Sequence, residues 1–194
     1  SVFMYLPPSM FYPAFCLKLA AASGIPFHLI IKLSVVAADA GIAVLLFGLG
    51  LKLAGRRRAV LWGTLYAFNP VSILIVSFHG SITSLMTPLM LAAYLLFSID
   101  HRRYLRSCAL LLGLATAWRS FPILLLPLFL TALPSRRDRA VFTAYVLVPN
   151  LLWALPFLWA DWRAMLSAIT AYSGWGLHHG AFGALRALRL VSIG

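Results

Sequence analysis

Long apolar runs alternate with short basic clusters along this chain. The longest runs cover residues 29–53, 59–78, 82–99 and 140–160. A hydrocarbon core about 30 Å thick takes roughly 20 helical residues, and backbone polar groups inside lipid must pair within their own segment. The pattern therefore predicts an all-α fold, a polytopic transmembrane helical bundle that forms a single domain over residues 1–194.

Two shorter apolar runs, residues 105–118 and 121–133, predict a helical hairpin. Each run is too short for a relaxed span, yet arginines flank the pair on both sides. If those arginines share one side of the membrane, the chain must turn back at Arg119, Ser120 and Pro122, near the outer half of the bilayer. The alternative is a single kinked helix, which would place the flanking clusters on opposite sides.

The two ends of the chain give separate expectations. Residues 10–22 form a short apolar piece that Gly24 and Pro26 end, so we expect an interfacial or re-entrant helix. The chain opens on Ser1 without a basic leader and closes on Gly194 after an unfinished apolar run. It is therefore expected to be a fragment of a longer protein.

The run 140–160 carries residues that disturb a helix. Pro149, Asn150 and Pro156 lie inside it, which predicts a kink or local unwinding. From Arg163 onward the sequence predicts an outer loop, followed by the start of another helix.

Charge is strongly one-sided, with 16 Lys and Arg against 4 Asp and Glu and a net charge of +12. A soluble protein so basic would suggest nucleic acid, but 62% hydrophobic residues leave too little polar surface for a soluble chain. The basic clusters are Arg56, Arg57 and Arg58, then Arg102, Arg103 and Arg106, then Arg136, Arg137 and Arg139. Such clusters mark cytoplasmic loops, so we expect membrane lipids as partners and no nucleic acid.

Lys32 and Asp39 lie within one predicted span. A spacing of seven puts them on nearly the same helical face, about 10 Å apart along the axis, so each needs its own partner or water. Lys32 either binds a ligand or extends its amine to the outer interface. Asp39 near mid-span either has a functional role or accepts a hydrogen bond from the start of a neighbouring helix.

Other candidate site residues are His79, Arg119, His178 and His179. His79 precedes Gly80 and is either an interface residue or a ligand. Arg119 at the hairpin tip has a donor fork suited to phosphate oxygens, and the alternative is an anchor for two short helices. The adjacent pair His178 and His179 is poorly placed for a metal, and no metal site is expected, but a loop could present the pair to a substrate.

Five short segments within residues 1–134 resemble, in the same order, sequence motifs of a known protein family. They are Tyr5-Leu6-Pro7-Pro8, Lys32 with Asp39, Tyr66-Ala67-Phe68-Asn69-Pro70, His79-Gly80-Ser81-Ile82-Thr83-Ser84-Leu85, and Gly113 to Pro122 followed by Leu126-Pro127-Leu128. Their order resembles that in the polyprenyl-phosphate-sugar-dependent membrane glycosyltransferases of the GT-C class. The resemblance is to the bacterial alpha-mannosyltransferase-like branch and, more distantly, to the first mannosyltransferase of GPI-anchor assembly. Ser81 and Thr83 replace the usual Gln and Asp, and Arg119 replaces the usual Lys.

The resemblance implies a multi-pass protein of the bacterial plasma membrane that transfers a mannose-like hexose. The donor would be a polyprenyl or dolichyl phosphate sugar, and the acceptor would lie on the non-cytoplasmic face. Arg119 would stabilise the leaving phosphate with help from Lys32 or His79, and Tyr5 would join the substrate-binding residues.

The family's acidic base would lie upstream of Ser1, so no catalytic base is assigned. The alternatives are a non-catalytic subunit degenerate from that family, and a lipid or small-molecule transporter.

Overall fold

A computed structural model of the chain describes residues 7–74, 76 and 82–170, with the side chains of residues 11–74, 76 and 84–163. The chain forms two compact units, Tyr5–Leu155 and a second that comprises Ser1–Met4 and Pro156–Gly194. Within the described residues the regular structure consists of helices and no strands, which confirms the all-α prediction.

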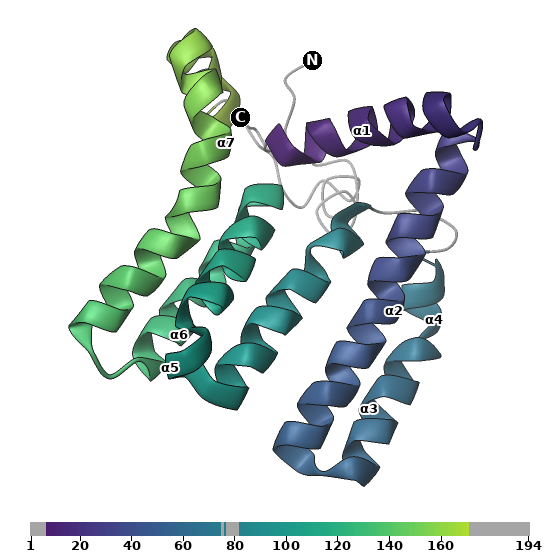
Figure 1. Cartoon of the computed structure of the whole chain (residues 1–194), viewed down its shortest axis with the longest axis vertical. Coiled ribbons are helices and arrows are strands. Elements are labelled where there is room, and N and C mark those ends of the chain that lie inside the picture. The colour runs from purple at the N-terminus through teal and green to yellow at the C-terminus, as the bar shows by residue number, and fades with distance from the viewer. Residues whose placement is uncertain (1–6, 75, 77–81, 171–194) are drawn as a thin grey trace, which may run out of the picture. The chain divides into compact units, whose positions relative to one another are not determined.

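Figure 1 shows the helices in chain order. They are α1 (Pro7–Ser23), α2 (Phe27–Ala54), α3 (Arg56–Ala67), α4 (Pro70–Ile73), α5 (Thr87–Trp118), α6 (Leu126–Ala132) and α7 (Arg136–Thr170), with 3-10 turns at Ile82–Leu85 and Phe121–Leu125. Two stretches, Phe27–Ala54 and Arg136–Arg163, each have 28 residues and are long and apolar enough to cross a membrane. These two helices confirm the first and last of the predicted long runs.

Helix α1 runs across the end of α2 rather than along it (Figure 1). Gly24 has φ +70° and Pro26 directly precedes α2, so the chain changes direction where the sequence predicted. The predicted short helix at residues 10–22 is therefore present, and it begins three residues earlier, at Pro7.

The predicted span over residues 59–78 is wrong as a single helix. Helix α3 has 12 residues and ends at Ala67, and α4 begins at Pro70. Asn69 is extended because the proline ring disfavours the helical region for the residue before it. Its side-chain oxygen then accepts a hydrogen bond from the Val71 amide at 3.0 Å, which caps the new helix.

Helix α5 bends sharply at Asp100, which has φ −158° and ψ 97°. The Asp100 carboxylate accepts hydrogen bonds from the Arg103 amide at 3.1 Å and the Arg102 amide at 3.0 Å, and it thereby caps the second limb, residues 101–118. The bond from the Arg103 amide is the largest influence that holds the Asp100 pKa below its ordinary value. The first limb, residues 87–99, is about 20 Å long and so shorter than the predicted span over 82–99.

The predicted hairpin at Arg119 is confirmed. Helix α5 ends at Trp118, and Arg119 is extended, with φ −146° and ψ 143°. A 3-10 turn and α6 then run back along α5 toward its bend at Asp100. The Phe129 ring of α6 consequently lies 5.0 Å from the ring of Phe97, which is close to that bend. A single kinked helix would have carried Phe129 away from this contact.

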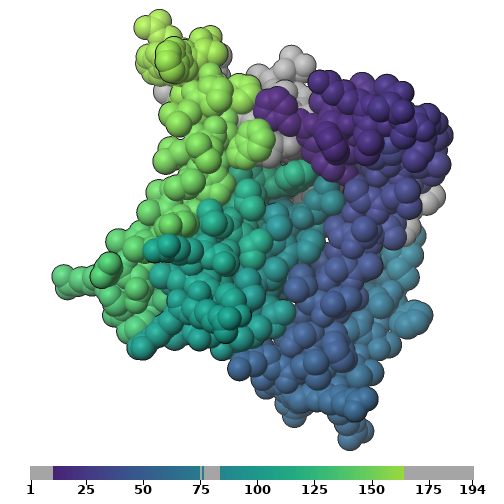
Figure 2. All heavy atoms as spheres, viewed as in Figure 1, coloured from purple at the N-terminus to yellow at the C-terminus, as the bar shows by residue number. Residues whose placement is uncertain are grey.

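A core of aromatic and small side chains joins α5, α6 and α7. The Phe129 ring stacks on Phe142 at 5.3 Å and meets Phe97 edge-on. The buried members of the cluster are Ala93, Cys108, Ala109, Leu112, Phe129, Leu133, Phe142 and Val146. Figure 2 shows side chains filling the space between the ribbons of α2 and α5 as well, which are in contact.

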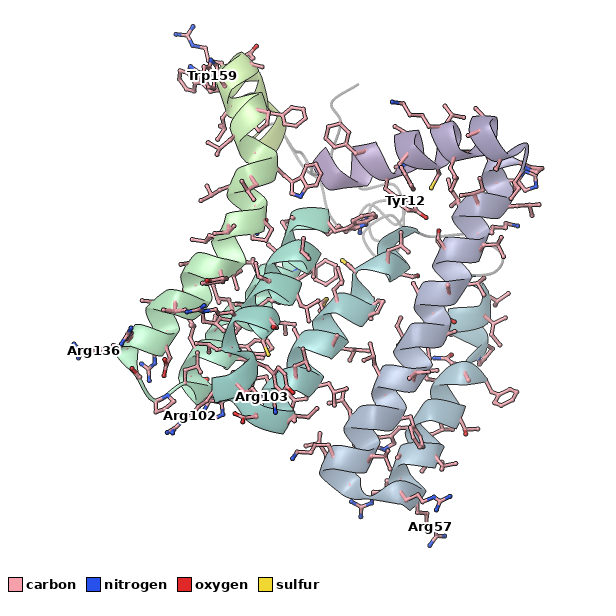
Figure 3. All side chains as sticks on the ribbon, in the orientation of Figure 1. Tyr12, Arg57, Arg102, Arg103, Arg136 and Trp159 are labelled. Atoms are coloured by element: carbon pink, nitrogen blue, oxygen red, sulfur yellow. The ribbon has the colours of Figure 1, made fainter. Side chains whose placement is uncertain are left out.

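The three basic turns lie at the same end of the Tyr5–Leu155 unit, as the positive clusters predicted. Figure 3 places Arg57, Arg102, Arg103 and Arg136 at this end and Tyr12 at the other. Packing agrees, since a methyl group at Gly48 would lie 3.3 Å from the Leu95 side chain. Gly48 precedes the α2–α3 turn by less than two helical turns, and Leu95 precedes the α5 bend in the same way. The α2–α3 turn and the α5 bend therefore lie at the same end of the unit.

The predicted unwinding of α7 is wrong. The backbone stays helical through Pro149, Asn150 and Pro156, and the one non-helical residue in the helix is Asp161. Asp161, with φ −161° and ψ 89°, breaks the helix directly after the predicted run 140–160, and a second helical segment continues to Thr170, where an outer loop was expected from Arg163. The Asn150 side-chain amide donates to the Val146 carbonyl at 2.8 Å, a hydrogen bond within the same turn of the helix.

Candidate functional site

Arg119 lies at the end of the Tyr5–Leu155 unit opposite the three basic turns. The α5 limb of residues 101–118 separates it from Asp100 by about 27 Å. Its backbone amide donates to the Ala115 carbonyl at 3.1 Å, the last bond of the helix, and its side chain is half-buried. A permanent positive charge is thus fixed at the tip of a tight hairpin.

Helix α1 supplies aromatic neighbours at the same end. The Tyr12 ring lies 5.4 Å from Trp118, the residue before Arg119, and the Tyr12 hydroxyl hydrogen-bonds to the Ser34 hydroxyl of α2. The Phe11 ring lies 5.6 Å from Trp153 of α7. Two side chains of α1 therefore connect it to α2, α5 and α7 next to the arginine.

The helix below Arg119 is firmly packed. Gly113, Ala115, Thr116 and Ala117 are buried, and the Thr116 hydroxyl donates back to the Leu112 carbonyl at 2.8 Å. The Asn150 side-chain amide also reaches across from α7 to the Gly113 carbonyl at 3.2 Å. The tip is consequently presented on a rigid base rather than on a loose loop.

Asp39 belongs to a separate polar cluster. Its carboxylate accepts hydrogen bonds from the Tyr66 hydroxyl at 2.6 Å and the Ser72 hydroxyl at 2.9 Å, and these two hydroxyls lie 3.2 Å apart. All three residues are half-buried. Because Tyr66 ends α3 and Ser72 lies in α4, the carboxylate joins the two helices across the break at Asn69. This is the hydrogen bond to a neighbouring helix start that was one of the two expectations for Asp39.

Lys32 and Asp39 do not pair, as their spacing predicted. Asp39 has the two hydroxyl partners, and the Lys32 side chain is exposed and forms no hydrogen bond or ion pair with another residue in the described part of the chain. The choice between ligand binding and an interfacial position for Lys32 stays open. Tyr5, His79, His178 and His179, also predicted as substrate contacts, lie outside the described residues.

Five residues in these two clusters were not singled out as site residues from the sequence. They are Tyr12, Ser34, Tyr66, Ser72 and Trp118. A usable signal existed for Tyr12 and Trp118, since tyrosine and tryptophan concentrate where apolar helices meet water. Tyr66 and Ser72 had no such signal, because their partner is 27 and 33 residues away.

The described carboxylates of the Tyr5–Leu155 unit are placed away from Arg119. Asp39 is held between α3 and α4, and Asp100 and Asp138 lie at the α5 bend and in the first turn of α7, at the basic end. Within the described residues no group of three or more His, Cys, Asp or Glu side chains could hold a metal ion. Among the described residues of this unit, the groups shown next to Trp118 and Arg119 are hydroxyl groups and aromatic rings.

Comparison with protein-family models, with curated proteins and with solved structures finds no match to this chain. The resemblance in five short segments thus has the residues themselves as its support.

Proposed function

We propose that the chain is a multi-pass integral membrane protein. In the most apolar stretch of α2 only 11% of the residues are buried, and in that of α7 17%. A soluble protein covers such helices with its own core, because large exposed apolar patches drive association. Hydrocarbon is the solvent that such surfaces require. The broken and shorter helices α3, α4 and α5 pack between or beside these two, within the same bilayer.

The orientation follows from the arginines. Positive loops remain on the cytoplasmic side, so the α2–α3 turn, the α5 bend and the α6–α7 turn face the cytoplasm. Arg119 and the crossing helix α1 then lie toward the outer side, with α1 in the interface.

Labelling of single cysteines tests this orientation. In a protein in which the buried Cys16 and Cys108 are replaced, Arg57→Cys, Arg103→Cys and Arg137→Cys are expected to react from the same side of sealed vesicles. Ser120→Cys is expected to react from the opposite side with a membrane-impermeant maleimide. Labelling of positions 103 and 137 from opposite sides would contradict the orientation.

We further propose that the chain acts on a polyprenyl-phosphate-linked sugar, as a membrane glycosyltransferase of the GT-C kind. The observation that carries this proposal is the half-buried Arg119 at the hairpin tip, at the end of the unit opposite the basic turns. A guanidinium can hold two phosphate oxygens by parallel hydrogen bonds, where a lysine gives a point charge. The rings of Trp118 and Tyr12 beside it form an apolar surface suited to the first prenyl units.

The reaction transfers a mannose-like hexose to an acceptor hydroxyl outside the cytoplasm. The acceptor oxygen bonds to the anomeric carbon while the bond from that carbon to the phosphate oxygen breaks, and the bonding pair leaves with the lipid phosphate. Arg119 stabilises the charge that grows on that phosphate, with Lys32 or His79 as assisting cations. The hydroxyl proton passes to a carboxylate base.

A second candidate function is a non-catalytic subunit that binds the same carrier. The location of the described carboxylates favours it, because Asp39 is engaged by Tyr66 and Ser72 and the others of this unit lie at the basic end. Carrier binding without sugar transfer by the purified chain would identify this case. Addition of a partner that supplies a carboxylate would then restore transfer.

Carrier binding is expected to depend on Arg119. Replacing Arg119 with glutamine should weaken binding of a polyprenyl-phosphate-sugar analogue about 30-fold, the equivalent of roughly 2 kcal/mol for a desolvated charged hydrogen bond. Arg57→Gln is the matched control, because it removes the same charge at the opposite end. Photo-crosslinking of the analogue to both folded variants measures the difference. Equal crosslinking would leave Arg119 as an anchor for the hairpin and remove the main support for the transferase.

A further inference from the structure

Six arginines belong to the α5 bend and the α6–α7 turn, and we call this region of the surface the arginine face. They are Arg102, Arg103, Arg106, Arg136, Arg137 and Arg139, and all six are exposed. The rings of Phe97, Phe129 and Phe142 contact one another and hold the bend and the turn next to each other. Figure 3 shows Arg102, Arg103 and Arg136 at this face and Arg57 apart from them, at the α2–α3 turn.

Two of these arginines are held in place by neighbouring helices. The Arg106 guanidinium carbon lies 5.6 Å from the centre of the Tyr145 ring, so α7 orients a side chain of α5. The Arg139 Nε donates to the Leu133 carbonyl at 2.8 Å, at the end of α6. That bond occupies one of five donors and leaves the two terminal amino groups for an external acceptor.

The two acidic residues of this region do not neutralise the face. One oxygen of Asp100 accepts the two backbone amides that begin the second limb of α5, and Asp138 is half-buried in the first turn of α7. Neither carboxylate forms an ion pair with a residue that the structure describes. The face therefore retains an excess of positive charge together with oriented donor groups.

We propose that the arginine face binds the phosphate group of an acidic phospholipid of the phosphatidylglycerol type. A lipid fits better than a soluble anion because the charge adjoins exposed apolar surface: Ile99, next to the bend, is 47% exposed. Guanidinium groups held by Tyr145 and Leu133 would grip the phosphate, and the acyl chains would lie along the helices. The inference rests on the membrane placement proposed above and is independent of the sugar carrier and of Arg119.

The α2–α3 turn provides an internal control. Arg56, Arg57 and Arg58 lie at the same end and are equally exposed, but no aromatic ring or carbonyl of the described residues holds their guanidinium groups. Diffuse attraction to an anionic surface would treat the two sets of arginines alike. A specific phosphate site would depend on the arginine face and not on the arginines of the α2–α3 turn.

The test measures binding of phosphatidylglycerol and phosphatidylcholine to the full chain in neutral detergent micelles by native mass spectrometry. Phosphatidylglycerol is expected to bind the unchanged protein at least about tenfold more tightly. This preference should fall about tenfold in the pair Arg106→Gln with Arg139→Gln, and less than about twofold in Arg56→Gln with Arg57→Gln. Soluble glycerophosphate at the same concentration should not displace the lipid.

A third pair, Arg102→Gln with Arg136→Gln, guards against loss of folding, since neither side chain forms a hydrogen bond, ion pair or ring contact with another described residue. It should also weaken binding while the melting temperature in phosphatidylcholine micelles stays unchanged. Equal weakening by all three pairs would overturn the site in favour of diffuse attraction. An unchanged protein that shows no preference for phosphatidylglycerol, or lipid displaced by glycerophosphate, would overturn it as well.

Discussion

Replacing Gly113 with alanine is expected to lower the free energy of unfolding by about 3 kcal/mol. A Cβ atom at this position would lie 2.5 Å from the Val146 carbonyl oxygen and 3.1 Å from two ring atoms of Pro149. These are atoms of a helix backbone and of a rigid ring, and neither can rotate away. Helices α5 and α7 would have to separate, which would also stretch the hydrogen bond from Asn150 to the Gly113 carbonyl.

Gly41→Ala is the matched control, because a Cβ at Gly41, inside helix α2, meets nothing within 4 Å. Alanine is the better helix former, by up to about 1 kcal/mol, so this change should be neutral or stabilising. Equilibrium unfolding of both variants in mild detergent, followed by tryptophan fluorescence, gives the comparison. Similar stabilities for the two variants would mean that α5 and α7 are less closely packed than the structure has them.

Much of the helix arrangement could be predicted from the sequence, because the apolar runs are long and the arginines mark their ends. The direction reversal at Arg119 followed from two short runs between two basic clusters, and the ring contact of Phe97 with Phe129 confirms it. The common end of the basic turns followed from the same clusters, and the packing of Gly48 against Leu95 agrees with it. In each case a signal local to the turn was sufficient.

The errors arose where hydrophobicity alone was followed. The run 59–78 was predicted as one helix although Asn69 and Pro70 carry an interruption signal, since the residue before proline avoids the helical region. The opposite error occurred in α7, where a kink or unwinding was expected at Pro149 and Pro156, but the backbone stays helical at both prolines and breaks at Asp161 instead. A proline fits within a helix when neighbouring groups satisfy the backbone, and its sequence position alone does not show where the helix breaks.

The candidate site could be predicted only in part for a related reason. Arg119 was found because a charge between two apolar runs is costly and therefore noticeable. The Tyr12 ring, which contacts Trp118 next to Arg119, belongs to a helix that crosses the bundle. Nothing in the sequence indicates which residues such a helix contacts. The partners of Asp39 are equally remote in sequence, so only tertiary structure could identify the hydroxyl groups that bind it.

Asp39→Ala is expected to destabilise the protein by about 3 kcal/mol, because it removes the acceptor of two half-buried hydroxyl groups and leaves the Tyr66 hydroxyl without an acceptor. Tyr66→Phe should cost about half as much. The double variant should be less damaging than the sum of the two, since Asp39 and Tyr66 contact each other directly. Tyr94→Phe is the control for loss of a tyrosine hydroxyl, because no hydrogen bond to that hydroxyl exists among the described residues.

Asp39→Asn separates the structural role of this carboxylate from a catalytic one. The amide oxygen of asparagine can still accept from Tyr66 and Ser72, so stability should fall by less than about 1 kcal/mol and carrier binding should be unchanged. A general base at this position would add complete loss of sugar transfer to this result, because an amide cannot take up the acceptor proton. Unfolding and sugar transfer should therefore be measured on the same preparation of Asp39→Asn. Retained transfer would assign Asp39 a structural role as the bridge across the α3–α4 break, and lost transfer in a folded protein would identify it as the general base.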